Sequence, residues 1–141
     1  MYELFDNLIE IYGVTGDKTS EQWFDMYYED GCNLLDKFDE EDWNELKEEL
    51  PNKSNPWKEC MVFCFGDNNN QHEIDILNEL SNTEDEQLFI SVADKIRLCF
   101  DYDKIENIEA IKKRVSEIKD HMGVPTQMVL NSFLEKSKKS R

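Results

Sequence analysis

Hydrophobic side chains recur at helical spacing along almost the whole chain. The clearest pattern runs at intervals of three and four residues through Ile105, Ile108, Ile111, Val115, Ile118 and Met122. Such intervals place side chains on one face of an α-helix, whereas a strand would need apolar residues at every second position. A second, wider pattern between residues 88 and 100 predicts a central helix that contacts neighbours on two sides.

Capping residues indicate where these helices begin and end. Asp39 precedes an acidic first turn, and Thr83 stands three residues before a glutamate, which is the spacing of a capping box. Asn55 followed by Pro56 predicts another helix start. Pro51 should end the preceding helix, because a proline ring cannot continue the hydrogen-bond ladder.

Together these signals predict an all-α fold of about seven to eight short helices. We expect the helices at residues 2–12, 20–30, 40–50, 56–65, 71–81, 84–101, 105–122 and 125–137, with frayed ends at 137–141. The length of 141 residues predicts a single helical domain over residues 1–141. Short links favour antiparallel neighbours, stacked between residues 40 and 101 as helix hairpins like those of HEAT and armadillo proteins.

The chain is strongly acidic, and its charge is unevenly distributed. Residues 1–103 carry 27 acidic and 7 basic residues, a net charge of −20. Residues 104–141 carry 5 acidic and 9 basic residues, a net charge of +4. Such a field attracts a basic partner and speeds its association. It also argues against direct binding of nucleic acid, whose phosphates require lysine and arginine.

The N-terminus and the cysteines predict a cytoplasmic protein. The first residues lack the basic and apolar regions of a signal peptide, and no stretch is apolar for long enough to span a membrane. Cys32, Cys60, Cys64 and Cys99 are scattered among hydrophobic neighbours. We therefore expect buried thiols in a reducing compartment.

Signals for metal binding and catalysis are weak. Cys60 and Cys64 share a predicted helix, but the second ligand pair of a zinc site is absent, which favours packing in the core. Residues 67–72 resemble the start of a calcium loop, yet His72 replaces its glycine and Asn78 its final glutamate. We expect no cofactor, metal or catalytic residue; a hydrolase that uses two of the many carboxylates is the enzymatic alternative.

The strongest candidate for binding is an acidic strip, which we define as Glu41, Glu45 and Glu48. Their spacings of four and three stack three carboxylates on the face opposite the apolar residues of the predicted helix 40–50. Like charges at these spacings repel by a few tenths of a kcal/mol per pair. A solvated outer face is the simpler interpretation, and a docking strip for lysine and arginine is the functional one.

Further contacts are predicted in a polar loop and at one tyrosine. The loop residues Asp67, Asn69 and Asn70 offer adaptable hydrogen-bonding groups. Tyr102 stands between two aspartates, and tyrosines among carboxylates suit protein interfaces. The alternative for Tyr102, as for the aromatic cluster at residues 23–28, is packing in the core.

The stretch from Trp43 to Asp101, 59 of the 141 residues, resembles small helical immunity proteins of bacterial polymorphic toxin systems, those of contact-dependent growth inhibition above all. The segments 57–59 (Trp-Lys-Glu) and 92–94 (Val-Ala-Asp) are its most distinctive pieces. The resemblance implies a cytosolic protein without enzymatic activity that binds one cognate toxin domain, often a nuclease, and occludes its active site. It assigns no site residues.

Resemblance and charge lead to the same expectation by separate routes. A nuclease is typically basic because it holds a polyanion, and an acidic inhibitor can use the same cations as docking points. We therefore expect an immunity protein that neutralises a basic toxin domain. The alternatives are an acidic DNA mimic that inhibits several nucleic-acid-binding proteins and, less favoured, a carboxylate- or metal-dependent hydrolase.

Overall fold

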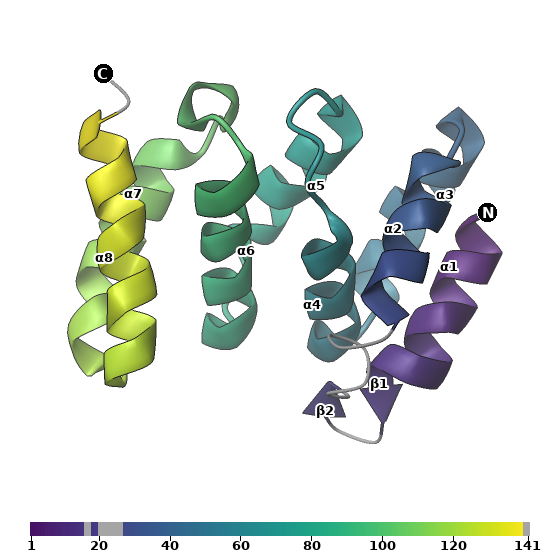
Figure 1. Cartoon of the computed structure of the whole chain (residues 1–141), viewed down its shortest axis with the longest axis horizontal. Coiled ribbons are helices and arrows are strands. Elements are labelled where there is room, and N and C mark those ends of the chain that lie inside the picture. The colour runs from purple at the N-terminus through teal and green to yellow at the C-terminus, as the bar shows by residue number, and fades with distance from the viewer. Residues whose placement is uncertain (16–17, 20–26, 140–141) are drawn as a thin grey trace. The chain divides into compact units, whose positions relative to one another are not determined.

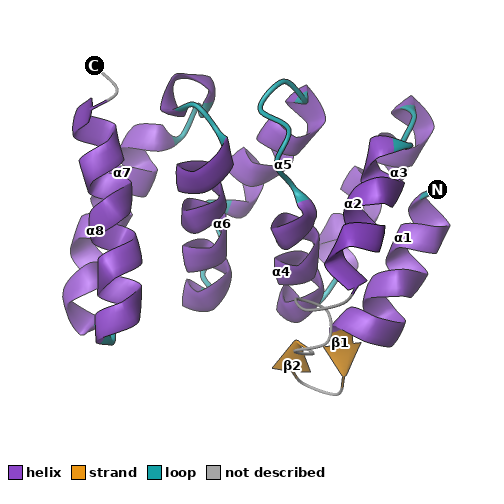
Figure 2. Ribbon diagram, viewed as in Figure 1, coloured by secondary structure: helices purple, strands orange, loops and turns teal. Residues whose placement is uncertain are grey.

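The computed structural model describes residues 1–15, 18–19 and 27–139, and within them the chain forms eight α-helices (Figure 1). The predicted all-α class is confirmed; the strands in Figure 2 are a single two-residue ladder. The chain divides into two compact units, Met1–Phe65 and Gly66–Arg141. A single domain over the whole chain and the stacking of hairpins across residues 40–101 stay predictions.

The first unit contains four α-helices and the two short strands. In chain order these are α1 (Tyr2–Leu8), the π-helical turn η1 (Ile9–Gly13), β1 (Val14–Thr15), β2 (Lys18–Thr19), α2 (Tyr28–Asp36), α3 (Glu40–Glu49), the 3-10 turn η3 (Leu50–Asn52) and α4 (Asn55–Cys64). The strands pair antiparallel, with Val14 opposite Thr19. α1 packs against α2 and α3, and α4 packs against α2 and η1.

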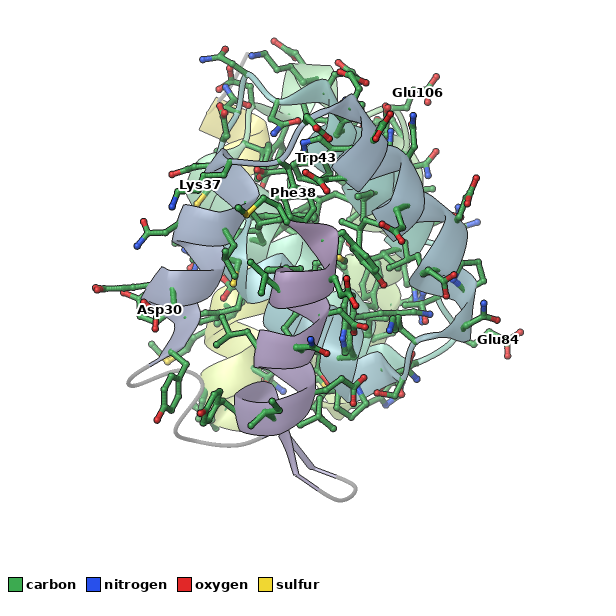
Figure 3. All side chains as sticks on the ribbon, turned by 90° about the vertical axis from the view of Figure 1, so that its right-hand side faces the viewer. Asp30, Lys37, Phe38, Trp43, Glu84 and Glu106 are labelled. Atoms are coloured by element: carbon green, nitrogen blue, oxygen red, sulfur yellow. The ribbon has the colours of Figure 1, made fainter. Side chains whose placement is uncertain are left out.

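Aromatic rings fill the core of the first unit. Trp57 on α4 is fully buried, and its ring lies edge-on to Phe5 on α1, with centroids 6.0 Å apart. Phe5 also meets Phe38 at 5.7 Å, and Phe38 meets Trp43 at 5.0 Å (Figure 3). Edge-to-face pairs of this kind add about 0.5–1.5 kcal/mol beyond the burial of their surface. These rings connect α1, α3 and α4, and Leu35 on α2 is also buried.

The second unit contains the other four helices. They are α5 (Gln71–Leu80), α6 (Glu86–Cys99), α7 (Ile108–Ile118) and α8 (Val124–Lys139), with 3-10 turns η4 (Tyr102–Lys104) and η5 (Lys119–His121). α6 packs against both α5 and α8, which confirms the prediction of a central helix touched from two sides. Five apolar residues of α6 are buried: Leu88, Phe89, Val92, Ala93 and Ile96.

Two polar side chains attach α7 to the turn between α5 and α6. The amide of Asn107 donates to the carbonyl oxygen of Asn78 (2.9 Å) and to Ser81 Oγ (3.1 Å). The guanidinium of Arg114 donates to the carbonyl oxygen of Thr83 and lies over the ring of Phe89, 4.2 Å from its centroid. The carbonyl of Thr83 thereby finds a partner outside its own turn, and that of Asn78 gains a second donor beside the Ser81 hydroxyl.

Helix starts agree with the sequence in one case and differ by one or two residues in others. Asp39 and Asp42 form the full capping box at the start of α3. Ser54, rather than Asn55, caps α4 by accepting a hydrogen bond from the amide of Trp57 (3.3 Å). Asp85, rather than Thr83, caps α6, since its carboxylate reaches the amide of Leu88 at 2.8 Å. The Thr83 hydroxyl instead accepts from the amide of Asp85.

The end predicted for the helix at residues 20–30 is wrong. Residues 20–26 lie outside the described part, and α2 runs from Tyr28 to Asp36, through a segment that we expected to be a link. Gly31 lies inside α2, although glycine costs a helix about 1 kcal/mol relative to alanine. Burial of Leu35 one turn later offsets that cost.

A buried polar contact fastens α1 to α4 and to the turn before it. Asp6 Oδ1 accepts from Trp57 Nε1 at 3.0 Å and from Lys53 Nζ at 2.8 Å. Lys53 and Asp6 retain only 15% and 23% side-chain exposure. One carboxylate thus satisfies an indole donor inside the core and neutralises a cation at its edge.

Asp6→Ala should lower the free energy of unfolding by about 2 kcal/mol, because it leaves a buried indole N–H and a half-buried ammonium without their acceptor. Asp6→Asn, which keeps an acceptor oxygen, should lose less. Urea unfolding followed by tryptophan fluorescence measures both. The control is Glu10→Ala at an exposed position of η1, expected to change stability by less than about 0.5 kcal/mol. Equal effects of the two alanine substitutions would show that this contact is not an anchor.

Candidate functional site

The helix that carries the acidic strip is held firmly at its N-terminus. Asp39 Oδ1 accepts from the amide of Asp42 at 2.9 Å, and the amide of Asp39 donates to Asp42 Oδ2 at 3.1 Å. Asp42 Oδ1 also accepts from the amide of Tyr2 and lies 3.4 Å from the N-terminal ammonium. Slight desolvation opposes the effect, but these donors hold the pKa of Asp42 below its ordinary value.

The acidic strip lies on the outer face of α3, as predicted. Trp43, Leu46 and Leu50 are 4%, 0% and 2% exposed and face the core. Glu41, Glu45 and Glu48 are exposed. A capped helix with a buried apolar face keeps the spacing of these carboxylates fixed, so the strip presents a rigid row of negative charge.

The polar loop 67–70 is ordered by bonds within its own unit. Asp67 Oδ1 accepts from the amide of Asn69 at 2.9 Å. Asn68 exchanges two hydrogen bonds with Asp101, and Lys104 Nζ donates to the carbonyl oxygen of Asn68 at 2.9 Å. Asp67 and Asn69 stay exposed and available to a partner.

Asn70 has a structural role in this loop. Its Oδ1 accepts from the amide of His72 at 2.9 Å and more weakly from that of Glu73 at 3.4 Å, so it is the N-cap of α5. A partner that recruited this amide oxygen would have to uncap the helix, at a cost of about 1 kcal/mol. The contact predicted between Asn70 and a partner stays a prediction.

Tyr102 does not lie on an accessible surface, and its predicted contact with a partner does not fit the structure. The side chain is 4% exposed and stacks on Phe133, with centroids 4.8 Å apart. Its hydroxyl donates to the carbonyl oxygen of Phe133 at 2.8 Å, and burial raises its pKa. Lys136 Nζ lies over the ring and donates to two carbonyl oxygens at the end of α6. The core-packing alternative holds for this residue.

The aromatic cluster at residues 23–28 is only partly described, since Trp23 and Phe24 lie outside the described residues. Tyr27 stacks on Tyr12 with centroids 4.2 Å apart. Tyr28 meets Phe63 edge-on at 5.2 Å. These rings pack at the edge of the first unit.

Two of the four cysteines are buried as expected. Cys60 and Cys64 are buried on α4, whereas Cys32 and Cys99 are only half-buried, and none of the four forms a disulfide. Cys64 Sγ donates to the carbonyl oxygen of Tyr28, and Cys32 Sγ to that of Cys64. Within the described residues, no group of three or more histidine, cysteine or acidic side chains is arranged to hold a metal ion.

Sequence reasoning missed one buried carboxylate, Glu73. It is 5% exposed, and its Oε1 accepts from the amides of Gly66 (2.8 Å) and Asp67 (3.2 Å) at the start of the polar loop. Desolvation raises its pKa to about 7; the two amide donors and, more weakly, Lys95 oppose the rise, and Asp67 adds to it. Glu73 stands three residues after the cap Asn70, a spacing that could have drawn attention to it.

The predicted contacts are divided between the two units. The acidic strip belongs to the first unit and the polar loop to the second.

Comparisons with models of protein families, with curated proteins and with solved structures found no match to this chain. In the part of the chain that the structure describes, no helix combines the length and the apolar character needed to cross a bilayer.

Glu73 should make stability fall as pH rises. Its folded pKa of about 7 exceeds the ordinary value of 4.5, so between these pH values the folded state binds more protons than the unfolded state. The free energy of unfolding should decrease by up to about 3 kcal/mol across that window. Glu73→Gln keeps the acceptor oxygen but cannot ionise, and should remove this decrease.

Urea unfolding at a series of pH values measures the effect. Glu79→Gln, at an exposed position of the same helix, is the matched control and should leave the pH dependence unchanged. A Glu73→Gln protein with the same slope as the parent between pH 4.5 and 7 would contradict the assignment.

Proposed function

We propose that this chain is an immunity protein, which binds a cognate bacterial toxin domain of basic charge and neutralises it in the cytoplasm without catalysis. The observation that carries the proposal is the acidic strip of Glu41, Glu45 and Glu48, exposed on a capped helix. Its unit holds 17 acidic and 5 basic residues, a net charge of −12, against −4 for the second unit. The resemblance of residues 43–101 to such proteins supports the same class.

The mechanism has two stages with different physical origins. Charge attraction first brings the basic toxin domain to the strip, and this stage is fast and sensitive to salt. Short-range contacts then hold this chain over the active site of the toxin domain and exclude the toxin's substrate. Affinity depends on a few buried anchors within the interface rather than on total area.

The buried carboxylate favours inhibition by binding over hydrolysis. A hydrolase would bring convergent acids with shifted pKa values into one concavity. Glu73, whose pKa is strongly raised, instead has its acceptor oxygen engaged by two backbone amides at a loop. The strip carboxylates are exposed, as docking groups are.

Glu41→Lys combined with Glu45→Lys should slow association with the toxin domain by about tenfold at low salt and weaken the salt dependence of the rate. The domain to test is the C-terminal domain encoded by the reading frame immediately upstream. Stopped-flow mixing gives the rate, and survival of cells that express the toxin domain gives neutralisation.

The matched control is Glu106→Lys combined with Glu117→Lys, which changes the net charge equally at exposed positions of the second unit. We expect its association rate to stay within about twofold of the parent, since these carboxylates are not part of the proposed docking strip. Equal rates for the parent and both variants would reject the strip as a docking site. A parent chain that binds the toxin domain but leaves cells unprotected would reject the proposed function.

A further inference from the structure

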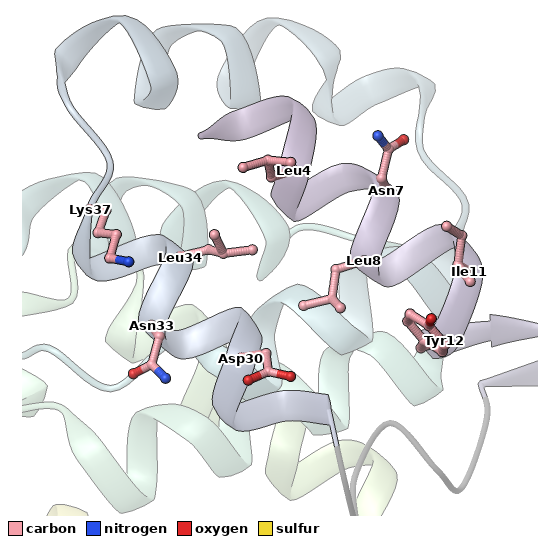
Figure 4. A pocket seen from close by; sticks show the side chains of 9 residues that line it. All are labelled: Leu4, Asn7, Leu8, Ile11, Tyr12, Asp30, Asn33, Leu34 and Lys37. Carbon is pink, nitrogen blue, oxygen red and sulfur yellow. The ribbon is translucent and has the colours of Figure 1, made fainter.

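The first unit contains an open groove between α1 with η1 on one side and α2 on the other. The two segments run in opposite directions (Figure 1). The groove has a volume of about 490 Å³, and Figure 4 shows the side chains that line it. From α1 and η1 these are Leu4, Asn7, Leu8, Ile11 and Tyr12; from α2 and its C-cap they are Asp30, Asn33, Leu34 and Lys37.

The apolar residues of this groove are unusually accessible. Leu4 and Ile11 are 54% and 64% exposed, and with Leu8 they follow one another at spacings of four and three. They form one apolar ridge along α1 and η1, and Leu34 of α2 lines the groove as well. Scattered exposed leucines need no explanation, but a contiguous apolar furrow with a polar rim marks a place where another surface binds.

Charges beside the groove indicate what kind of surface fits. Asp30 and Lys37 are directed outward along α2 and balance each other (Figure 3). Beyond them, helical spacing places Glu3 and Glu10 on the outer flank of the α1 side.

The α2 side carries the equivalent pair. Glu29 and Asp36 are also seven residues apart and lie beyond Asn33 on the outer flank of that helix. All four flanking carboxylates are exposed, so the groove is apolar along its floor and negative along both edges.

We propose that this groove receives a basic amphipathic helix of the toxin domain, one that inserts two or three aliphatic or aromatic side chains and places lysine or arginine against the acidic flanks. The inference rests on the proposed function and assigns to it the surface that supplies short-range affinity. Binding of an amphipathic helix by its apolar face is a recurrent mode of recognition and suits anchors at spacings of three and four.

The same charges argue against other occupants. A second copy of the chain would bring equal acidic flanks against these, and like charges at an interface are unfavourable. Anionic lipid headgroups and nucleic acid meet the same repulsion. The groove differs from the acidic strip on α3 in having an apolar floor, whereas the strip offers charge without a hydrophobic surface.

The test uses a synthetic helical peptide of about 14 residues, with leucines at the spacing of Leu4, Leu8 and Ile11 and lysine at the other exposed positions. A second peptide replaces every lysine by glutamate. Titration calorimetry at about 0.1 M salt measures binding of both to the full chain. We expect the lysine peptide to bind, and we expect the dissociation constant of the glutamate peptide to be higher by about tenfold or more.

Leu4→Ser combined with Ile11→Ser should weaken binding of the lysine peptide by about tenfold or more, because two exposed anchors are lost. Leu98→Ser combined with Met128→Ser is the matched control: these residues are 59% and 65% exposed but belong to the second unit. It should bind the peptide like the parent. Thermal unfolding by circular dichroism verifies that both variants keep the fold.

Four outcomes would overturn the proposal. They are the absence of binding by the lysine peptide, equal binding of both peptides, equal loss in the two serine variants, and sedimentation showing a dimer that Leu4→Ser with Ile11→Ser dissolves. A failed peptide test beside intact neutralisation of the toxin domain would reject the groove alone. Peptide binding at the groove without protection of cells would reject the proposed function alone.

Discussion

Burial of apolar helix faces in a chain with a net charge of −16 is the constraint on which the rest of this structure depends. Each helix must turn leucine, isoleucine and aromatic side chains inward, which leaves the carboxylates at helix starts and on outer faces. Asp39 and Asp85 serve as caps, where the helix dipole stabilises negative charge. The carboxylates at helix starts are thus compatible with folding, and exposed carboxylates such as those of the acidic strip lie on the outer faces of the helices.

Asp6 and Glu73 show how partners compensate for the burial of a carboxylate. Asp6 receives the ammonium of Lys53 and the indole N–H of Trp57, so a cation balances its charge. Glu73 receives two backbone amides and only a weak attraction from Lys95, so desolvation prevails and its pKa rises. The difference follows from partners: a full positive charge offsets the loss of water better than two amide dipoles do.

The sequence predicts the helices well because apolar spacing and caps are local. The stripe through Phe89, Val92 and Ile96 and the capping box at Asp39 could be recognised without knowledge of the fold. Tyr102 could not, because its neighbours in sequence are exposed aspartates while its partner Phe133 lies 31 residues away. The exposure of Leu4 and Ile11 was equally hidden, since which face of α1 stays uncovered depends on where α2 packs. Long-range packing decides these cases.

The acidic strip and the apolar groove would act over different distances, although both belong to the first unit. Charge attraction between exposed groups extends about 10 Å at 0.1 M salt and accelerates encounter, but it contributes little once water and ions screen it. Burial of leucine side chains acts only at contact, yet salt barely weakens it. A basic partner that engaged both would also relieve the mutual repulsion of the carboxylates in a unit of net charge −12. Because such a partner binds only the folded state, the acidity that opposes folding of the unit alone would stabilise its complex.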